Sequence, residues 1–208
     1  MTSEAARLDR ADEKENAIIA AARKTFLARG FDSASMDTIA VTAGVSKRTV
    51  YNRFRSKEEL FAATIMDTCK RILPVNMDDV ANDLPPEQFM REMAISIVRA
   101  LFQPEAIALR RIAAFEAART PALGRAYLEH GPRWMVSTIA PVLERLAPSA
   151  GLEIDNVELA MWQLGSLITE PLHTTILMGE TDDNLDHAIE KQVECGLEAF
   201  FRIYRRPD

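Results

Sequence analysis

Proline is the residue that most strongly interrupts helices, and its distribution divides this chain of 208 residues into two parts. All ten prolines lie at or after Pro74, so the first 73 residues contain none. Apolar residues recur at helical spacing in both parts, as at Ile18 and Phe26, whereas the alternating pattern of strands is scarce. The sequence therefore predicts an all-α protein with two domains, residues 12–73 and 74–208.

The composition excludes several classes of protein. Two cysteines, Cys69 and Cys195, are too few for a disulfide framework and are not paired as zinc ligands would be. The three histidines also lack the mutual spacing of a metal site. No run of about 18 apolar residues suggests a membrane span, and the charged N-terminus does not resemble a secretory signal. We expect a cytoplasmic protein with no metal, no cofactor and no membrane partner.

Motifs typical of enzymes do not occur in the sequence. The eight glycines are isolated from one another, so neither a phosphate-binding loop nor a dinucleotide fingerprint can be built. The patterns G-x-S-x-G and H-E-x-x-H do not occur either. We therefore expect no enzyme. A helical enzyme with a site assembled in space, or a module that only sequesters a ligand, is the alternative.

Capping residues divide the N-terminal part into four helices. Each predicted helix begins after a side chain that can accept a backbone N–H, and the first two end at a glycine. The first runs from about Glu13 to Arg29, after Asp12 and before Gly30; the second covers Met36–Ala43, between Ser35 and Gly44; the third extends from Lys47 to about Phe54, after Ser46; and the fourth follows Ser56, with Glu59 completing a capping box.

A run of basic residues lies at the third helix. Residues 47–57 carry a charge of +5 with no acidic residue, although the whole chain has a net charge of -6. A solvated helical face would also explain such a run. However, Lys47, Arg48 and Lys57 are expected in the first turns of two helices, where the helix dipole disfavours cations. A polyanion bound across both helix starts would offset that cost.

The third helix has two different faces. Val50 and Phe54 are four residues apart and are expected to pack on a small core with Ile39, Ala40 and Val45. The opposite face carries Arg48, Tyr51 and Asn52 and is free to enter a DNA groove. Arg48 suits guanine and Asn52 suits adenine, whereas the hydroxyls of Thr49 and Tyr51 suit phosphate. The alternative is a packed ring for Tyr51 and helix packing for Thr49.

At these residues the sequence resembles the TetR (tetracycline repressor) family of transcriptional regulators. The resemblance covers residues 21–31, 35–40, 43–54 and 56–60, about a quarter of the chain. It implies an N-terminal three-helix DNA-binding bundle with a helix-turn-helix, joined to a helical ligand-binding and dimerisation domain. It also implies that Ser35 and Thr38 contact the DNA backbone, that Lys47 to Asn52 form the recognition helix and that Lys57 binds phosphate. Family recognition helices often have a small residue where this chain has Arg48.

The C-terminal part resembles the AefR-like group of the same family. The resemblance rests on residues 116–125 (EAARTPALGR), followed by His130-Gly131-Pro132. In the family this region holds a small-molecule effector. The apolar, aromatic and thioether side chains available for a pocket, for each of which core packing is the alternative, are Phe89, Met93, Ile97, Phe102, Phe115, Tyr127, Trp134, Met135, Trp162 and His173.

Two segments near the C-terminus, about residues 156–178 and 184–205, each carry a wide apolar stripe. Helix pairs of this kind commonly bury their stripes against a symmetry mate, although a core within one chain is the alternative. Pro141 and Pro171 predict kinks or breaks in the long helices. A homodimer would place two recognition helices on a palindromic site.

These observations lead to one functional hypothesis. The chain is expected to be a dimeric regulator of transcription that binds operator DNA and is released by a small, largely apolar effector. Repression is the expected sign, with activation as the alternative. A redox switch through Cys69, which lies beside Lys70 and Arg71, is a further alternative.

Overall fold

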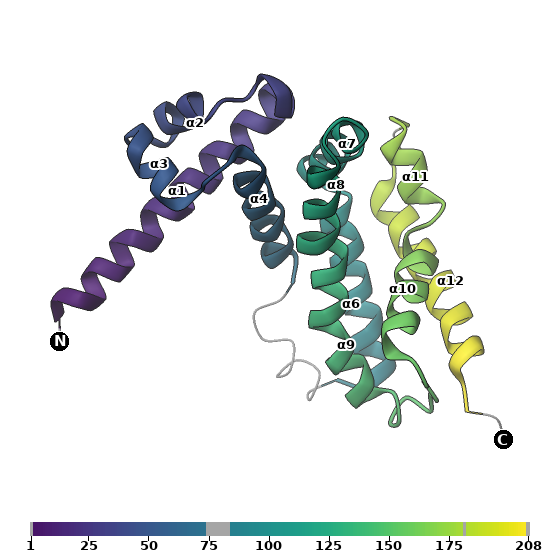
Figure 1. The fold of residues 1–208 in the computed structure, drawn as a ribbon. Helices are drawn as coiled ribbons and strands as arrows, with labels where there is room; N and C mark the ends of the chain where they lie inside the picture. The colour runs from purple at the N-terminus through teal and green to yellow at the C-terminus, as the bar shows by residue number, and fades with distance from the viewer. Residues whose placement is uncertain (1, 74–83, 181, 207–208) are drawn as a thin grey trace. The chain divides into compact units, whose positions relative to one another are not determined.

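A computed structural model describes the backbone of residues 2–73, 84–180 and 182–206, and side chains from residue 12 onward. Within these residues every regular element is a helix, and an isolated antiparallel bridge joins Leu152 and Arg205 (Figure 1). The all-α prediction is therefore confirmed.

The chain forms two compact units that do not follow the order of the sequence. One consists of Met1–Lys70 with Ala108–Gly131, and the other of Arg71–Ile107 with Pro132–Asp208. The domain boundary predicted between residues 73 and 74 adjoins residues 74–83, which lie outside the described residues, and it stays a prediction. The segment Ala108–Gly131, which sequence alone assigned to the C-terminal domain, clusters with the N-terminal helices.

The N-terminal unit begins with four helices, and most of their bounds agree with those predicted from the capping residues. They are α1 (Thr2–Ser33), α2 (Met36–Ala43), α3 (Lys47–Arg53) and α4 (Lys57–Ile72). The predicted bounds of α2 are confirmed. Ser35 Oγ accepts the N–H of Thr38, and Gly44 ends the helix with a left-handed backbone at φ 67°.

The first helix differs from the prediction at both ends. It starts at Thr2, so Asp12 lies inside it and does not cap it. No proline or glycine precedes Asp12, and a run of good helix formers overrides the capping signal. Gly30 interrupts the helix at the predicted point with φ 73°, but helical turns resume as far as Ser33.

Aromatic side chains form the centre of this unit. Phe26, Phe31 and Phe61 are buried, and their ring centroids lie 5.3–5.7 Å apart. Nearby, α2 and α3 have the predicted small core, in which Ile39, Ala40, Val50 and Phe54 are buried and Val45 is half-buried. Most of α7 (Pro104–Ala117), together with α8 (Pro121–Leu128) and the start of the π-helical turn Glu129–Arg133, completes the unit.

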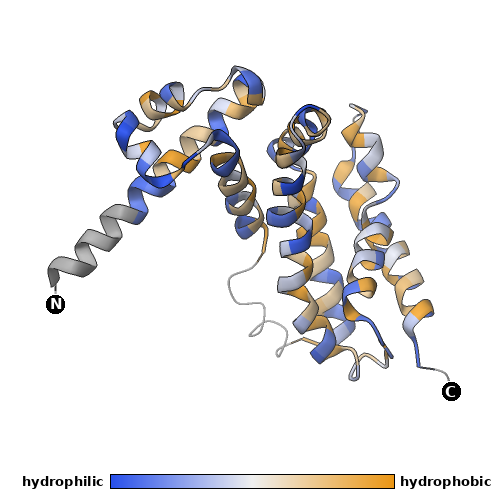
Figure 2. Cartoon of the chain, viewed as in Figure 1, coloured by the Kyte–Doolittle hydropathy of each residue, from blue (hydrophilic) through white to orange (hydrophobic). Residues whose placement is uncertain are grey.

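The C-terminal unit is a layered helical bundle. Its helices are α6 (Pro86–Leu101), α9 (Trp134–Leu146), α10 (Val157–Thr169), α11 (Leu172–Leu177) and α12 (Leu185–Tyr204). Their shared core includes Phe89, Val98, Leu143, Ile189 and Phe200. Figure 2 shows apolar and polar residues following one another along these helices, as expected for amphipathic segments with one buried side.

The predicted stripe of the last helix packs mainly inside this unit, against α10. Figure 1 shows the two helices side by side, and Ile189, Val193 and Phe200 are buried. Pro171 separates α10 from α11, as predicted, whereas Pro141 lies inside α9 and does not end it. The predicted core alternative therefore accounts for much of the α12 stripe.

Candidate nucleic-acid interface

The turn between α2 and α3 fixes the orientation of the third helix. Gly44 provides the left-handed residue, and the N–H of Val45 bonds to the carbonyl of Ala40 at 3.1 Å. Ser46 then caps α3, because its Oγ accepts the N–H of Thr49 at 3.1 Å. This geometry buries Val50 and leaves the opposite side of α3 exposed.

The exposed face carries the residues that the sequence assigned to DNA. Arg48, Tyr51 and Asn52 are all exposed, and the Tyr51 side chain has 45% of its surface accessible. The guanidinium of Arg48 forms no ion pair or hydrogen bond with any side chain or backbone group that the structure describes. A long cation, a phenol and an amide therefore project together from one short helix, as groove reading requires.

The predicted backbone contacts lie at the two helix starts. Ser35 Oγ is 2.9 Å from Thr38 Oγ1, and Ser46 Oγ is 2.8 Å from Thr49 Oγ1. In each pair the serine Oγ also accepts the backbone N–H that caps α2 or α3, and each of these bonds is at the exposed surface. A phosphate oxygen could be reached without breaking the caps, because a hydroxyl can accept one bond and donate another.

The five basic residues of the charged run have different surroundings. The Arg53 guanidinium pairs with Glu15 of α1 at 3.0 Å, which ties α3 to the first helix. Lys47 pairs with Asp37 of α2, and the hydrogen bond and charge of Asp37 raise the pKa of Lys47. Arg55 is exposed, and no partner of its side chain occurs in the described part of the chain.

Lys57 has a role that the sequence did not suggest. Its Nζ donates to the carbonyl oxygens of Phe31 at 2.6 Å, Ala34 at 3.0 Å and Asp32 at 3.2 Å. The same atom lies 4.3 Å from the centre of the Phe31 ring. All three N–H donors of the ammonium are thus used within the protein. These carbonyls offset the cost of a cation at the start of α4, so no phosphate is needed to explain it.

Sequence reasoning missed Asp37 and undervalued Arg55. Asp37 lies ten residues before Lys47, a separation at which no local pattern predicts contact, and only the turn at Gly44 brings the two together. Arg55 belongs to the basic run, but it follows α3 and is on neither face of a predicted helix. Its exposed guanidinium makes it a further candidate for phosphate contact.

The residues predicted to line an effector pocket do not share one environment. Phe89, Ile97, Phe102, Met135 and His173 are buried in the C-terminal unit, and Met93 is packed against its core. Trp134 is half-buried, and Trp162 is 39% exposed. Phe115 and Tyr127 belong to the N-terminal unit, where Phe115 is 70% exposed and burial raises the pKa of Tyr127.

His173 is a well-bonded core histidine. Its ring lies 5.9 Å from Phe102, and its Nδ1 lies 3.1 Å from Glu170 Oε1. Although burial alone would raise the pKa of Glu170, hydrogen bonds from Thr174 and His173 hold it below the ordinary value. This environment matches core packing, the alternative given above for each residue of the predicted pocket.

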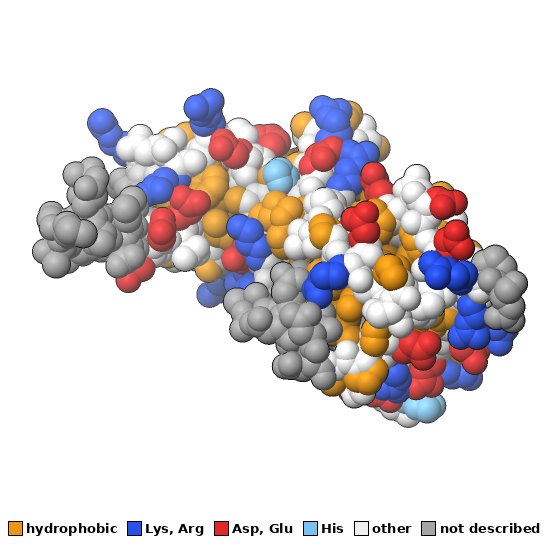
Figure 3. Space-filling model, turned by 90° about the horizontal axis from the view of Figure 1, so that it is seen from below, with side chains coloured by type: hydrophobic (Ala, Val, Ile, Leu, Met, Phe, Trp, Pro, Cys, Tyr) orange, Lys and Arg blue, Asp and Glu red, His pale blue; other side chains and the backbone are white. Residues whose placement is uncertain are grey.

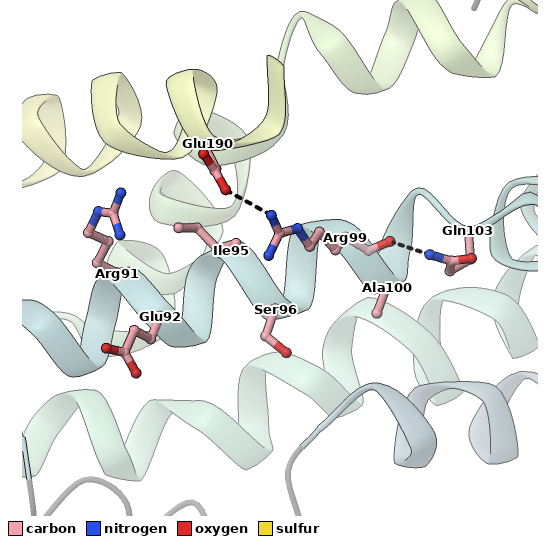
Figure 4. Close-up of a pocket in the computed structure, with 8 residues that line it drawn as sticks. All are labelled: Arg91, Glu92, Ile95, Ser96, Arg99, Ala100, Gln103 and Glu190. Carbon is pink, nitrogen blue, oxygen red and sulfur yellow. Dashed lines mark hydrogen bonds and ion pairs between the residues drawn. The ribbon is translucent and has the colours of Figure 1, made fainter. Parts of the chain in front are cut away.

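One hollow of about 540 Å³ lies along α6 in the C-terminal unit (Figure 4). Arg99 bonds to Glu190 of α12 across it, and Gln103 donates to the carbonyl of Arg99. The other lining residues are Arg91, Glu92, Ile95, Ser96 and Ala100. None of the predicted pocket residues lines this hollow, and its charged walls differ from the expected apolar pocket.

Exposed charges of both signs are common on this protein. On the face drawn in Figure 3, basic and acidic side chains lie interspersed. Exposed ion pairs such as Arg91 with Glu194 and Arg99 with Asp186 belong to the same pattern in the C-terminal unit. Isolated surface pairs contribute little to stability. They do pair Arg91 and Arg99 with acidic side chains, unlike Arg48 and Arg55.

The two cysteines have opposite surroundings. Cys69 is buried in α4, and burial raises the pKa of its thiol to about 11. A thiol with so high a pKa carries little thiolate at neutral pH, which disfavours the redox switch through Cys69. Cys195 is exposed on α12.

A two-helix motif with a buried inner side and a polar, partly basic outer side defines a DNA-binding regulator of the helix-turn-helix class. The model of bacterial regulatory proteins of the tetR family matches residues 18–64, and that of the AefR-like transcriptional repressor C-terminal domain matches residues 88–206. The chain belongs to the TetR family of transcriptional regulators. Both predicted resemblances are confirmed.

Solved structures agree over nearly the whole chain. A TetR-family regulator from Mesorhizobium loti is 27% identical with a TM-score of 0.78, and the match covers 95% of this chain and 99% of that one. The flavonoid-responsive regulator FrrA is 35% identical with a TM-score of 0.74, covering 94% and 98%.

Curated relatives match over shorter segments. The transcriptional activator FasR of Mycolicibacterium smegmatis is 46% identical over 54 residues, which are 26% of this chain and 25% of that protein. The matches to the first three curated relatives span 25–43% of those proteins. Among the described residues, no helix is long and apolar enough to cross a bilayer.

Proposed function

We propose that this protein is a dimeric, cytoplasmic repressor that binds a palindromic operator and is released by a small, largely apolar effector. The observation that carries this proposal is the outer face of α3, where Arg48, Tyr51 and Asn52 project while Val50 anchors the helix. We assign base contacts to Arg48 and Asn52. Phosphate contacts are assigned to Ser35, Thr38, Lys47, Thr49 and Tyr51, with Arg55 added.

Dimerisation is proposed through the outer sides of α10 and α12. Leu159 and Trp162 lie one turn apart on α10 and are 51% and 39% exposed, and Ile203 of α12 is 59% exposed. These apolar side chains face away from the shared core of their own unit. A twofold contact would cover them, because an isologous interface pairs the same patch on both copies.

The proposed regulation is a shift between two states of the dimer. An effector that binds more tightly to the state with the wider separation of the recognition helices shifts the dimer toward that state and lowers its affinity for the operator. The decrease is limited by the difference between the effector's affinities for the two states. We propose the buried aromatic and thioether side chains of the C-terminal unit, including Phe89, Phe102 and Met135, as the effector region. Because FrrA is described as flavonoid-responsive, a flavonoid is the first probe.

The experiment that tests this function is a titration of the purified protein with the DNA that flanks its own gene. We expect binding to this DNA to be at least about a thousandfold tighter than to random DNA at the same salt concentration. The preformed complex is then titrated with the flavonoid, which is expected to release the DNA. Equal affinity for flanking and random DNA would refute sequence-specific regulation at those sites, whatever the flavonoid does.

Replacing Arg48 with Ala is expected to relax preference at one base position by about 1–3 kcal/mol, because a bidentate contact to guanine is lost. The measurement is affinity for a set of operator duplexes, each changed at one base pair. Arg55→Ala is the matched control: it should weaken binding to all duplexes alike, since it removes only a phosphate contact. An unchanged base profile in the Arg48 variant would show that this side chain positions the helix without reading a base.

A further inference from the structure

An acidic side chain lies beside the proposed DNA-binding face. Asp37 is in the first turn of α2, and its Oδ1 and Oδ2 lie 2.8 Å and 2.9 Å from the Nζ of Lys47 at the start of α3. Both side chains are well exposed, at 61% and 59%. The pair therefore bridges the two helices of the helix-turn-helix on its solvent side.

This ion pair is a poor stabilising device. Exposed pairs of lysine and carboxylate contribute little to folding because water and salt screen them. Moreover, Lys47 is in the first turn of α3, where the helix dipole opposes its charge. The Nζ of Lys47 also lies 5.8 Å from the centre of the Tyr51 ring, so two side chains attract the ammonium to the same place. The pair holds a cation in one place beside an outward-facing residue of α3.

We propose that Asp37 is a specificity-determining residue, which restrains Lys47 and so limits binding to DNA of the wrong sequence. The proposal rests on the proposed function, because it concerns the same face of α3. In this proposal, an acidic residue of α2 determines how freely a cation of α3 can reach DNA phosphates.

The physical basis is the difference between the two modes of DNA binding. Binding to random DNA depends almost wholly on cations that displace counterions from phosphates, and a mobile lysine can adapt to any phosphate nearby. Asp37 prevents this adaptation because it pairs Lys47, and its own charge repels the DNA backbone. On the operator, base contacts from Arg48 and Asn52 fix the register and bring the phosphate proposed for Lys47 within its reach, so the loss of Asp37 adds less there.

The test is Asp37→Asn, which keeps the size of the side chain and removes its charge. We expect the variant to bind random duplex DNA five- to tenfold more tightly at about 0.1 M salt, with the slope of log affinity against log salt steeper by about 0.9, the value for one more phosphate contact. Operator affinity should rise by less, so the ratio of specific to random binding falls. The melting temperature should fall by no more than about 2–4 °C, because the pair is exposed and the main loss is the favourable interaction of the Asp37 carboxylate with the N-terminal end of α2.

A double-mutant cycle with Lys47→Gln separates restraint from simple loss of an acidic charge. In the Lys47→Gln background, Asp37→Asn should leave the salt slope unchanged and give only a small gain in affinity. An unchanged slope in the single Asp37→Asn variant, or a gain of full size in the Lys47→Gln background, would overturn the proposal. Random DNA serves in each arm, so the result stands even if the native protein shows no operator preference, which would refute the proposed function instead.

Discussion

Replacing Gly196 with Ala is expected to lower the free energy of unfolding by about 2–3 kcal/mol, although alanine favours helices over glycine. A Cβ at this position of α12 would lie 2.5 Å from the carbonyl oxygen of Leu167 and 2.9 Å from the backbone nitrogen of Ile168. Both atoms belong to the backbone of α10, so the helices must separate. The same carbonyl accepts a bond from Gln192 Nε2 at 2.8 Å, which the separation would strain. Urea unfolding followed by circular dichroism measures the change.

Gly165→Ala is the matched control for this prediction. Gly165 lies in α10, and nothing is within 4 Å of where its Cβ would be. The same substitution should there raise the free energy of unfolding by about 0.5–1 kcal/mol, because alanine loses less backbone entropy in a helix. If Gly196→Ala were as stable as the native protein, the close approach of α10 and α12 could not be what requires glycine.

Replacing Lys57 with Met is expected to lower stability by about 2–3 kcal/mol and to weaken binding to every DNA sequence. The methionine has a side chain of similar length, but it lacks the donors to the carbonyls of Phe31, Asp32 and Ala34 and the cation over the Phe31 ring. Those bonds join the start of α4 to the end of α1. Their loss loosens the frame that holds α2 and α3. Unfolding and DNA titration on the same preparation measure both effects.

The salt dependence of DNA binding separates this anchoring role from the phosphate contact that the family resemblance implied. As an anchor, Lys57 contributes no counterion release, so the salt slope of the Met variant should equal that of the native protein. Unchanged stability with a slope shallower by about 0.9 would contradict the anchor and support the phosphate contact. Lys70→Met, at an exposed lysine of the same helix, is the control for loss of charge alone.

Sequence predicted the helix-turn-helix well because its signals are local. Ser35, Gly44 and Ser46 each act on backbone within four residues, and their caps give α2 and α3 the expected bounds. The spacing of Val50 and Phe54 likewise settles which face of α3 is buried. The predicted start of α1 was wrong, because a residue that can cap a helix does not end the helix on its N-terminal side when helix-forming residues precede it.

Contacts between distant segments could not be predicted in the same way. Lys57 meets the end of α1 across more than twenty residues, and Asp37 meets Lys47 across a turn whose geometry the sequence does not state. The effector residues show the same limit. Aromatic and thioether side chains at helical spacing indicate burial, but whether they face a pocket or a core depends on helix packing that periodicity does not encode.

The α3 helix divides its residues between two tasks that do not overlap. Ser46, Val50 and Phe54 hold the helix in place, whereas Arg48, Tyr51 and Asn52 face outward. Substitutions on the outer face leave the cap and the buried core untouched. With the base contacts proposed above, such substitutions would change which DNA is read at little cost in folding. A lineage that carries this fold can therefore acquire new target sequences by single substitutions, without first passing through unstable intermediates.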